Sequence, residues 1–378
     1  MADAMAHTTT PPVLHVLLTG GGTGGHVFPA LAVADELVKR GHQVSFAGSA
    51  HGLEAQLVAR HGLPFHAVAA RPLVGRGTGG KLLALGTLAT SAVRARSLCR
   101  RLGVDAVLGT GGYVSAPAVL GARLAGRPVL LLEPNAHTGV ANRWLSRFCQ
   151  EAAVTYPATV AELRCPARVT GAPVRPSFFA VEPLPEMPRG TRVLVLGGSQ
   201  GAQQINRLMP EAVARAAAAV GAVEVLHQSG AGRDQETAEA YRRALEALPE
   251  ATRPRIHVVP FLDDVAGAME RSHLLVSRAG ALTLAEICAA GRPSLLVPLA
   301  AALAHQLDNA RTLEEAGAAK VVDGAEADAA KLAAALEELL AAGPRLAAMG
   351  RAARDLAHPG AAAVIADRVE ALAKGVAA

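Results

Sequence analysis

The chain has 378 residues, a formal net charge of +5 and a composition that is 51% hydrophobic but only 3% aromatic. This length favours two domains, and the hydrophobic content excludes a disordered chain. The four cysteines lack CxxC or metal-binding spacing and are typical of small core residues in a reducing cytosol. No apolar run reaches the roughly 18 residues that span a bilayer.

The chain begins with residues 1–12, which lack the basic and apolar parts of a signal peptide, and we expect a loose tail there. A buried strand, Leu14–Leu18, then leads into the glycine turn Gly20–His26 and a helix over Ala30–Arg40. A strand, a glycine turn and a helix start form a phosphate site, because bare N–H groups and the positive helix end face an anion.

Strands and helices then alternate to about residue 154, which predicts a parallel sheet covered on both faces. The further strands expected are Val44–Ala47, Phe65–Val68, Ala106–Leu108, Val129–Leu132 and Ala153–Val154. The further helices expected are Leu53–Arg60, Leu82–Leu102, Ala116–Ala125 and Thr138–Leu145. A second glycine turn, Gly109–Ser115, is either an ordinary tight turn or a second part of a phosphate site.

No acidic residue occurs between Glu54 and Asp105. The basic residues of this segment are Arg60, Arg71, Arg76, Lys81, Arg94, Arg96, Arg100 and Arg101, and they are interspersed with Leu73, Val74, Leu82, Leu83 and Leu85. Cationic and aliphatic side chains together suit a surface on anionic lipid, and a solvated helix face is an equal alternative. Nucleic acid is disfavoured because stacking aromatic residues are missing.

Five prolines between Pro173 and Pro188 disfavour helix and sheet, so we expect an interdomain linker over residues 176–190. The domains would then be residues 13–175 and 191–357, and residues 358–378 would carry a helix that packs back on the first domain. The strands expected after the linker are Arg192–Leu196, Val223–His227, Ile256–Val259, Leu274–Val276, Ser294–Val297 and Lys320–Val322, and the helices are Ala327–Leu340, Pro344–Leu356 and Gly360–Lys374.

The second half repeats the phosphate-binding pattern of the first. Strand Arg192–Leu196 leads into the turn Gly197–Ala202, and strand Leu274–Val276 leads into Ser277–Glu286. Glu286 lies one turn into the helix. There its carboxylate can accept hydrogen bonds from two ribose hydroxyls, or it can simply be stabilised by the positive end of the helix dipole. Neither half has an acidic residue after its second strand, which argues against NAD enzymes. Neither half contains the motif GxxxxGK[ST], which argues against P-loop NTPases. No cofactor is expected.

These glycine turns, together with the segments His227–Gly230 and Phe261–Asp264, follow one another along the chain in the order typical of one known family. Together they resemble the bacterial undecaprenyldiphospho-muramoylpentapeptide β-N-acetylglucosaminyltransferases, the family that converts lipid I to lipid II in peptidoglycan synthesis. The resemblance runs from Leu14 to about Gly360 and implies the GT-B fold, which is α/β with two Rossmann-like parallel-sheet domains facing across a cleft. The chain departs from the family pattern at Leu132, where the family has His, at Ala172, where it has Asn, and at Ala304, where it often has an acidic residue.

The resemblance also implies the site. The second domain would bind UDP-GlcNAc and the first would take lipid I, with its diphosphate on the glycine turns. The implied donor contacts are Thr23, Gly24, Gly25, Asn135, Arg175, Ser199, Leu262, Arg278, Ala281, Leu282, Thr283, Glu286 and Gln306. The implied acceptor contacts are Gly21, Gly22, Gly111, Gly112 and Tyr113.

The family inverts the anomeric carbon in one displacement, and the chain contains no Asp-x-Asp for a catalytic cation. We therefore expect no metal, and we expect helix N-termini, Ser199, Arg175 and Arg278 to balance the charge of the leaving UDP. His26 is the candidate general base because an imidazole titrates near working pH, although it can instead only position the acceptor phosphate. Glu133 is the alternative base.

The resemblance implies a peripheral enzyme on the cytoplasmic face of the bacterial plasma membrane. Its partners would be UDP-GlcNAc, lipid I, anionic inner-membrane lipids and proteins of cell-wall synthesis and division, with no nucleic acid. The alternatives are a diacylglycerol glycosyltransferase, a UDP-GlcNAc 2-epimerase and a nucleotide-sugar-binding regulator without turnover.

Overall fold

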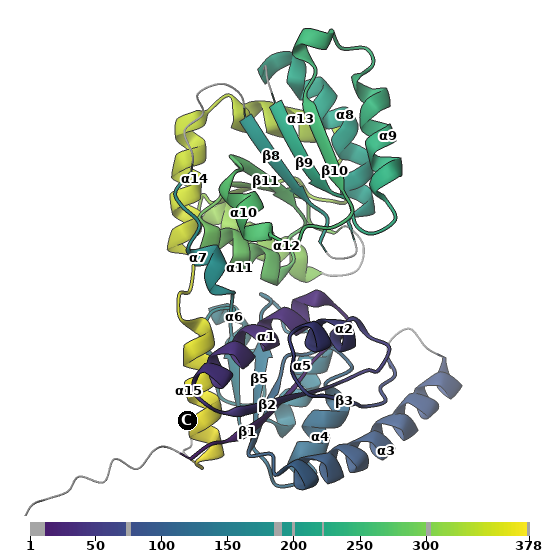
Figure 1. The fold of residues 1–378 in the computed structure, drawn as a ribbon, viewed down its shortest axis with the longest axis vertical. Helices are drawn as coiled ribbons and strands as arrows, with labels where there is room; N and C mark the ends of the chain where they lie inside the picture. The colour runs from purple at the N-terminus through teal and green to yellow at the C-terminus, as the bar shows by residue number, and fades with distance from the viewer. Residues whose placement is uncertain are drawn as a thin grey trace, which may run out of the picture.

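The computed structural model describes residues 12–72, 77–184, 191–198, 201–220, 223–299 and 304–375. Ser199, the linker residues 185–190 and the basic-segment residues Leu73, Val74 and Arg76 lie outside the described part, as does the side chain of Lys81. The chain forms two parallel sheets that lie one above the other along the long axis of the molecule (Figure 1). The expectation of two parallel-sheet α/β units is confirmed.

The first sheet has the strand order β3-β2-β1-β4-β5-β6-β7. Its strands are β1 His15–Thr19, β2 Gln43–Gly48, β3 Phe65–Ala67, β4 Ala106–Gly109, β5 Val129–Glu133, β6 Glu151–Val154 and β7 Ala167–Val169. The central strands are buried except for His15 at the start of β1, because helices cover both faces, which is why they read as continuous apolar runs. The sequence analysis missed β7, a three-residue edge strand with no buried residue.

The helices of the first unit are α1 Gly24–Lys39, α2 Leu53–Arg60, α3 Thr78–Leu102, α4 Ala116–Leu124, α5 Val140–Leu145 and α6 Pro157–Val160, with the 3-10 turn Ser146–Phe148. Helix α1 begins six residues before the predicted start at Ala30. The reason is that Gly24 and Gly25 already adopt helical geometry after the extended Thr23, so the helix N-terminus lies inside the glycine turn. An apolar pattern cannot reveal a helical turn made of glycine.

The second sheet has the order β10-β9-β8-β11-β12-β13. Its strands are β8 Thr191–Leu196, β9 Val223–Gln228, β10 Arg255–Val259, β11 Leu274–Ser277, β12 Ser294–Leu296 and β13 Ala319–Val321. Its helices are α8 Gln203–Val220, α9 Asp234–Leu245, α10 Val265–Glu270, α11 Ala281–Ala290, α12 Ala304–Glu315, α13 Ala329–Leu340 and α14 Gly343–Asp355, with the 3-10 turn Glu250–Thr252.

In each sheet the first strand lies between two strands whose connections run in opposite directions. Strand β1 pairs with β2 and β4, and β8 pairs with β9 and β11. The carboxyl ends of such strands open a crevice where ligands bind in doubly wound folds. All four expected phosphate turns lie at these two switch points, because they follow β1, β4, β8 and β11.

Two segments connect the units. Part of the expected linker is helical instead of irregular: α7, Pro176–Phe179, begins with a proline at its first position, where a missing N–H costs nothing. Phe178 of α7 is fully buried in the core of the second unit, beside Leu194 and Ile287. The prediction that the prolines prevent a helix was therefore wrong at these four residues.

Helix α15, Ala361–Ala373, returns from the second unit and lies along the first, beside α1 (Figure 1). Ile365, Ala366 and Val369 are buried in the same core as Val16 and Leu18. The guanidinium of Arg368 donates to both oxygens of Glu151, a carboxylate that is 2% exposed, at 2.6–3.0 Å.

No helix in the described ranges is both long and apolar enough to cross a membrane.

Candidate active site

The two glycine turns of the first unit contact each other backbone to backbone. A Cβ on Gly20 would lie 2.0 Å from Thr110 Oγ1, and one on Gly112 would lie 2.4 Å from the carbonyl oxygen of Gly21. Gly111 and Gly112 also have φ of +97° and +76°, which other residues rarely adopt. The two turns therefore pack together and form one continuous backbone surface.

The expected acceptor residues are brought together by this contact. Gly21 and Gly22 border Gly112, and the ring of Tyr113 is the atom group nearest to a Cβ on Gly22, at 3.9 Å. Tyr113 is 42% exposed, so its ring is available to a ligand above the turns.

Glu54, which the sequence analysis did not select, lies beneath the first turn. Its fully buried carboxylate accepts hydrogen bonds from the N–H of Gly22 at 3.3 Å and of Ser49 at 3.0 Å. A Cβ on Gly21, Gly48 or Gly52 would lie within 2.8 Å of this side chain. The glycines thus make room for the carboxylate, and Glu54 takes the N–H of Gly22, which lies just before the N-cap of α1.

His26, in the first turn of α1, points toward the second glycine turn. Its Nδ1–H donates to the carbonyl oxygen of Thr110 at 2.8 Å, which leaves Nε2 as the nitrogen able to accept a proton. Burial lowers the pKa of His26, and this effect outweighs the opposing influences of Glu133 and of the Thr110 hydrogen bond. The imidazole is therefore neutral at neutral pH, as a general base requires.

Glu133, the alternative base, is buried at the end of β5 and is held by four hydrogen bonds. One oxygen accepts from the backbone N–H of Asn135 at 3.1 Å and from its Nδ2 at 2.9 Å. The other accepts from the N–H of Gly139 at 2.9 Å and from Nδ2 of Asn142 at 3.0 Å. With these donors in place the carboxylate fixes the loop after β5, and the geometry favours His26 over Glu133 as the base.

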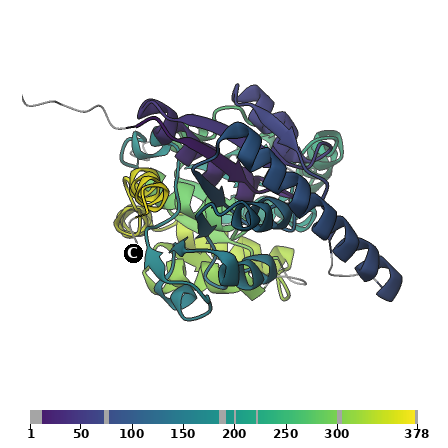
Figure 2. The same ribbon diagram turned by 90° about the horizontal axis from the view of Figure 1, so that it is seen from below.

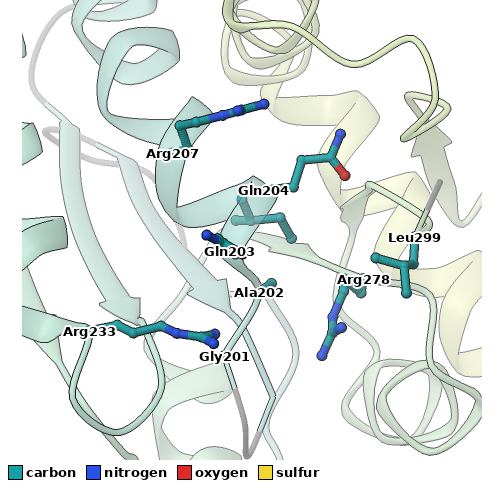
Figure 3. Close-up of a pocket in the computed structure, with 9 residues that line it drawn as sticks. Gly201, Ala202, Gln203, Gln204, Arg207, Arg233, Arg278 and Leu299 are labelled. Carbon is teal, nitrogen blue, oxygen red and sulfur yellow. The ribbon is translucent and has the colours of Figure 1, made fainter. Parts of the chain in front are cut away.

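The second unit presents a pocket of about 540 Å³ at the carboxyl ends of β8 and β11 (Figure 3). It is lined by Gly201, Ala202, Gln203, Gln204, Ile205, Arg207, Arg233, Arg278 and Leu299. Arg278 and Arg233 flank the glycine turn from opposite sides, and Arg278 donates to the carbonyl oxygen of Gly197 at 3.1 Å. Burial, and secondarily the nearby Arg233, lower the pKa of Arg278. Two guanidinium groups and a helix start make this pocket suited to an anion.

Helix α11 begins beside this pocket. Gly280 is its extended N-cap, so the N–H groups of Ala281, Leu282 and Thr283 form the free N-terminal turn. Glu286 follows on the same helix with a side chain that is 15% exposed, and burial raises its pKa to about 7 against the opposing effect of Arg175. Leu262, half-buried, lies in the loop between β10 and α10.

Arg175 and Gln306 reach this region from other segments. The guanidinium of Arg175 lies 3.9 Å from Glu286 and stacks near the rings of Phe178 and of Phe28, which belongs to α1 of the first unit. Gln306 Oε1 accepts from the N–H of Leu299 at 3.1 Å. The structure therefore places Arg175 beside Glu286 and against Phe28 of the first unit, and Ser199 lies outside its described part.

Polar side chains of α12 join the two units at the cleft. Asp308 lies 3.0 Å from Nε2 of His137, whose Nδ1 lies 2.7 Å from Glu162. The hydrogen bond to Glu162 chiefly raises the pKa of His137. Asn309 is fully buried and bonds to the loop that carries Asn135. The run His305–Asn309 was expected from the sequence to offer polar groups to a sugar, but only the tertiary structure revealed what Asn309 and Glu54 contact, because their partners are distant in sequence.

No group of three or more His, Cys, Asp or Glu side chains that could hold a metal ion occurs among the residues that the structure describes.

Comparison with known proteins matches both halves of the chain to one family. The model of the glycosyltransferase family 28 N-terminal domain matches residues 16–154, and the model of its C-terminal domain matches residues 192–366. Together these matches cover most of the chain.

The chain is similar to curated proteins named UDP-N-acetylglucosamine--N-acetylmuramyl-(pentapeptide) pyrophosphoryl-undecaprenol N-acetylglucosamine transferase. It is 42% identical to that of Pseudomonas syringae pv. tomato, over 91% of this chain and 95% of the relative. It is 42% identical to that of Ectopseudomonas mendocina, over 96% of this chain and 99% of the relative.

Among solved structures the chain is similar to Acinetobacter baumannii MurG, with 32% identity, a TM-score of 0.78, and coverage of 94% of this chain and 99% of that one. It shares its fold with the glycosyltransferase VinC, at a TM-score of 0.64, 17% identity, and coverage of 96% and 100% of the two chains.

Proposed function

The chain belongs to glycosyltransferase family 28, and on that premise we propose that it transfers N-acetylglucosamine from UDP-N-acetylglucosamine to lipid I, which gives lipid II. The observation that carries this conclusion is 42% identity, over nearly the whole chain, to relatives named for this reaction. The protein is thus an N-acetylglucosaminyltransferase of peptidoglycan synthesis with the two-domain GT-B fold. This function is favoured over a diacylglycerol glycosyltransferase, an epimerase and a regulator without turnover.

The donor fits the cleft side of the second unit. The uridine diphosphate would lie with its phosphates on the N-terminal turn of α11 and near Arg278, and its ribose on Glu286. The N–H groups of Ala281–Thr283 and the guanidinium are aligned before any ligand binds, which is the arrangement that stabilises a leaving anion. Leu262 would face the uracil, and Gln306 and Asn135 would reach the sugar.

The acceptor fits the paired glycine turns of the first unit. Gly21, Gly22, Gly111 and Gly112 have no side chain of their own, so a diphosphate can approach their backbone closely, although the N–H of Gly22 already donates to Glu54. Thr23, Gly24 and Gly25 open α1 directly beside them and would face the donor across the cleft.

In the proposed reaction His26 Nε2 takes the proton of the N-acetylmuramyl 4-hydroxyl. That oxygen bonds to C1 of the donor sugar while the bond from C1 to the phosphate oxygen breaks, and the bonding electron pair leaves with UDP. Attack opposite to the leaving group inverts C1 from α to β. Glu133 orients the loop that carries Asn135, since its four hydrogen bonds fix that loop.

We also propose that α3 docks on anionic lipid at the cytoplasmic face of the membrane, where lipid I is held by its polyprenyl chain. Helix α3 projects from the first unit (Figures 1 and 2), and Leu82, Leu83 and Leu85 are 51–71% exposed on it. Arg94 is also exposed. Arg96, which the sequence analysis placed in the basic surface, is half-buried, and its Nε is buried without a partner in the described structure. Association with cell-wall synthesis and division proteins stays a prediction of the resemblance.

The deciding experiment is transfer of radiolabelled N-acetylglucosamine to a short-chain lipid I analogue, with UDP release measured in parallel. Label in the lipid product and one UDP released per transfer are expected. Loss of UDP-GlcNAc without acceptor, or no turnover with it, would contradict the proposal.

A further inference from the structure

Asn309, in α12, is a buried side chain that hydrogen-bonds to both units at once. Its Oδ1 accepts from the backbone N–H of Ala136 at 2.8 Å. Its Nδ2 donates to Asn135 Oδ1 at 3.4 Å and to the carbonyl oxygen of Ala279 at 3.3 Å. Ala136 and Asn135 belong to the loop after β5 in the first unit, whereas Ala279 belongs to the second.

The groups that Asn309 contacts are parts of the donor site. The amide of Asn135 is held on its other side by Glu133, so it is fixed between a carboxylate of its own unit and Asn309 of the other. Ala279 directly precedes Gly280, the N-cap of α11, whose first N–H groups would face the diphosphate. Asn309 therefore links the side chain proposed for the sugar to the helix start proposed for the phosphates.

The neighbouring polar contact across the cleft is weaker. Asp308 and His137 are 35% and 45% exposed in their side chains, and exposed ion pairs contribute little. Asn309, in contrast, is fully buried, so separating the units would leave its amide and the N–H of Ala136 without these partners or would require water to replace them. The approach of the two units is thus coupled to the hydrogen bonds of this buried amide.

We propose that Asn309 is a positioning residue for sugar transfer, which sets Asn135 and the N-terminus of α11 in register when the two units approach. It touches no reacting atom in this scheme. The inference rests on the proposed function, because it takes Asn135 and α11 as donor contacts. The contacts proposed for the nucleoside, Glu286 and Leu262, lie within the second unit and do not depend on Asn309.

The test is Asn309→Ala, measured by steady-state transfer to the lipid I analogue and by calorimetric titration with UDP. Because misplacing groups by about 1 Å costs roughly 100-fold in rate, we expect kcat/KM to fall about 10- to 100-fold, mostly through kcat. UDP affinity should fall much less than kcat/KM, since UDP lacks the sugar that Asn135 would contact, although its diphosphate would lie on the N-terminus of α11. The control Thr312→Val removes a hydrogen bond within α12, from Oγ1 to the carbonyl oxygen of Asp308, and should leave both quantities unchanged.

A second variant, Asn309→Asp, keeps the size of the side chain and the acceptor for Ala136, but places oxygen against Ala279 and Asn135. It should fold and show the same loss of kcat/KM, with a much smaller loss of UDP affinity. Parent-like kcat/KM in a folded variant, or an equal loss of UDP affinity, would overturn the inference. A parent protein that binds UDP but transfers no sugar would instead overturn the proposed function.

Discussion

Burial pushes two site residues, His26 and Glu286, toward their neutral forms. The pKa of His26 is lowered and that of Glu286 is raised to about 7, in both cases mainly by desolvation. For His26 neutrality is the reactive state, since only the neutral imidazole can take a proton. For Glu286 neutrality would be a cost in the proposed ribose contact, since the ionised carboxylate is the form that would accept from two ribose hydroxyls.

Replacing His26 by Gln tests the general base. The amide cannot take a proton, so kcat for transfer should fall by about 10²–10⁴, the usual contribution of a general base. UDP affinity should be unchanged, because the nucleotide would lie on the second unit. Single-turnover transfer and calorimetry measure the two quantities. The same change at His51, an exposed residue outside the site, is the control, and near-parental kcat in His26→Gln would exclude this role.

The pH dependence of donor binding tests Glu286. UDP-GlcNAc should bind more weakly as the pH falls through about 7, because the carboxyl then binds a proton and loses its capacity to accept two hydrogen bonds. Glu286→Gln should bind about 1–3 kcal/mol more weakly at pH 8 and show little pH dependence. Calorimetry between pH 5.5 and 8.5 measures this, and parental affinity in the variant would refute the ribose contact.

The same pKa shift makes donor affinity and stability change in opposite directions with pH: affinity should rise with pH, whereas the free energy of unfolding should fall. The folded pKa of Glu286 lies above its unfolded value of 4.5, so the folded state binds more protons between these two values. The free energy of unfolding should therefore fall as the pH rises from about 4.5 to 7. Urea unfolding at these pH values should show a flatter profile for Glu286→Gln than for the parent. A profile equal to that of the parent would mean that burial does not hold this carboxyl in its neutral form.

At the scale of elements, the last helix, α15, stabilises the first unit. Its apolar face completes the core beside β1, and Arg368 neutralises Glu151, a carboxylate at the start of β6 that is almost fully buried. Arg168 lies 3.6 Å from the same carboxylate but is half-exposed, so it compensates only partly.

We predict that Arg368→Ala lowers the free energy of unfolding by about 3 kcal/mol, because it leaves a buried carboxylate without its main partner. Chemical denaturation followed by circular dichroism measures the change. Lys374→Ala removes an exposed contact to Glu370 in the same helix, at 3.8 Å, and should change stability by less than about 0.5 kcal/mol. Equal effects of the two substitutions would contradict the assigned role of Arg368.

Helix α3 is the element proposed to meet the membrane, and its exposed leucines allow a direct test. Replacing Leu82, Leu83 and Leu85 by Ser should weaken sedimentation with phosphatidylglycerol vesicles, because apolar area is no longer buried in the interface. Activity on a short-chain lipid I analogue should stay near parental.

The control for α3 replaces Val38 and Val364, exposed apolar residues on α1 and α15, by Ser. This control should bind vesicles like the parent. If both variants bind equally well, α3 is a solvated helix face and the membrane contact lies elsewhere.

At the scale of the whole molecule, the proposed mechanism balances charge with glycine turns and helix starts at the switch points of both sheets. Arg278 and the N-terminus of α11 supply positive charge where UDP would leave. Transfer should accordingly keep its rate in EDTA, because these groups can balance the developing charge. A rate abolished by EDTA and restored by Mg²⁺ or Mn²⁺ would contradict this mechanism.

The sequence by itself predicted the two parallel sheets, most of their strands, and the position of the glycine turns after β1, β4, β8 and β11. It could do so because apolar strands and glycine turns are local patterns with a local physical cause. It erred where that cause is absent or overridden, as at α1, whose first turn contains glycine, and at α7, where a proline begins a helix buried on the second unit.

Only the tertiary structure decided which polar groups act together. Glu54 lies beneath a turn more than thirty residues earlier in the sequence, and Asn309 bonds to a loop that its own sequence neighbourhood cannot indicate. The same holds for Glu133, whose four hydrogen bonds argue against its use as a base. The physical reason is that hydrogen bonding and desolvation depend on groups brought close by the fold, and these distances are not encoded in any single segment.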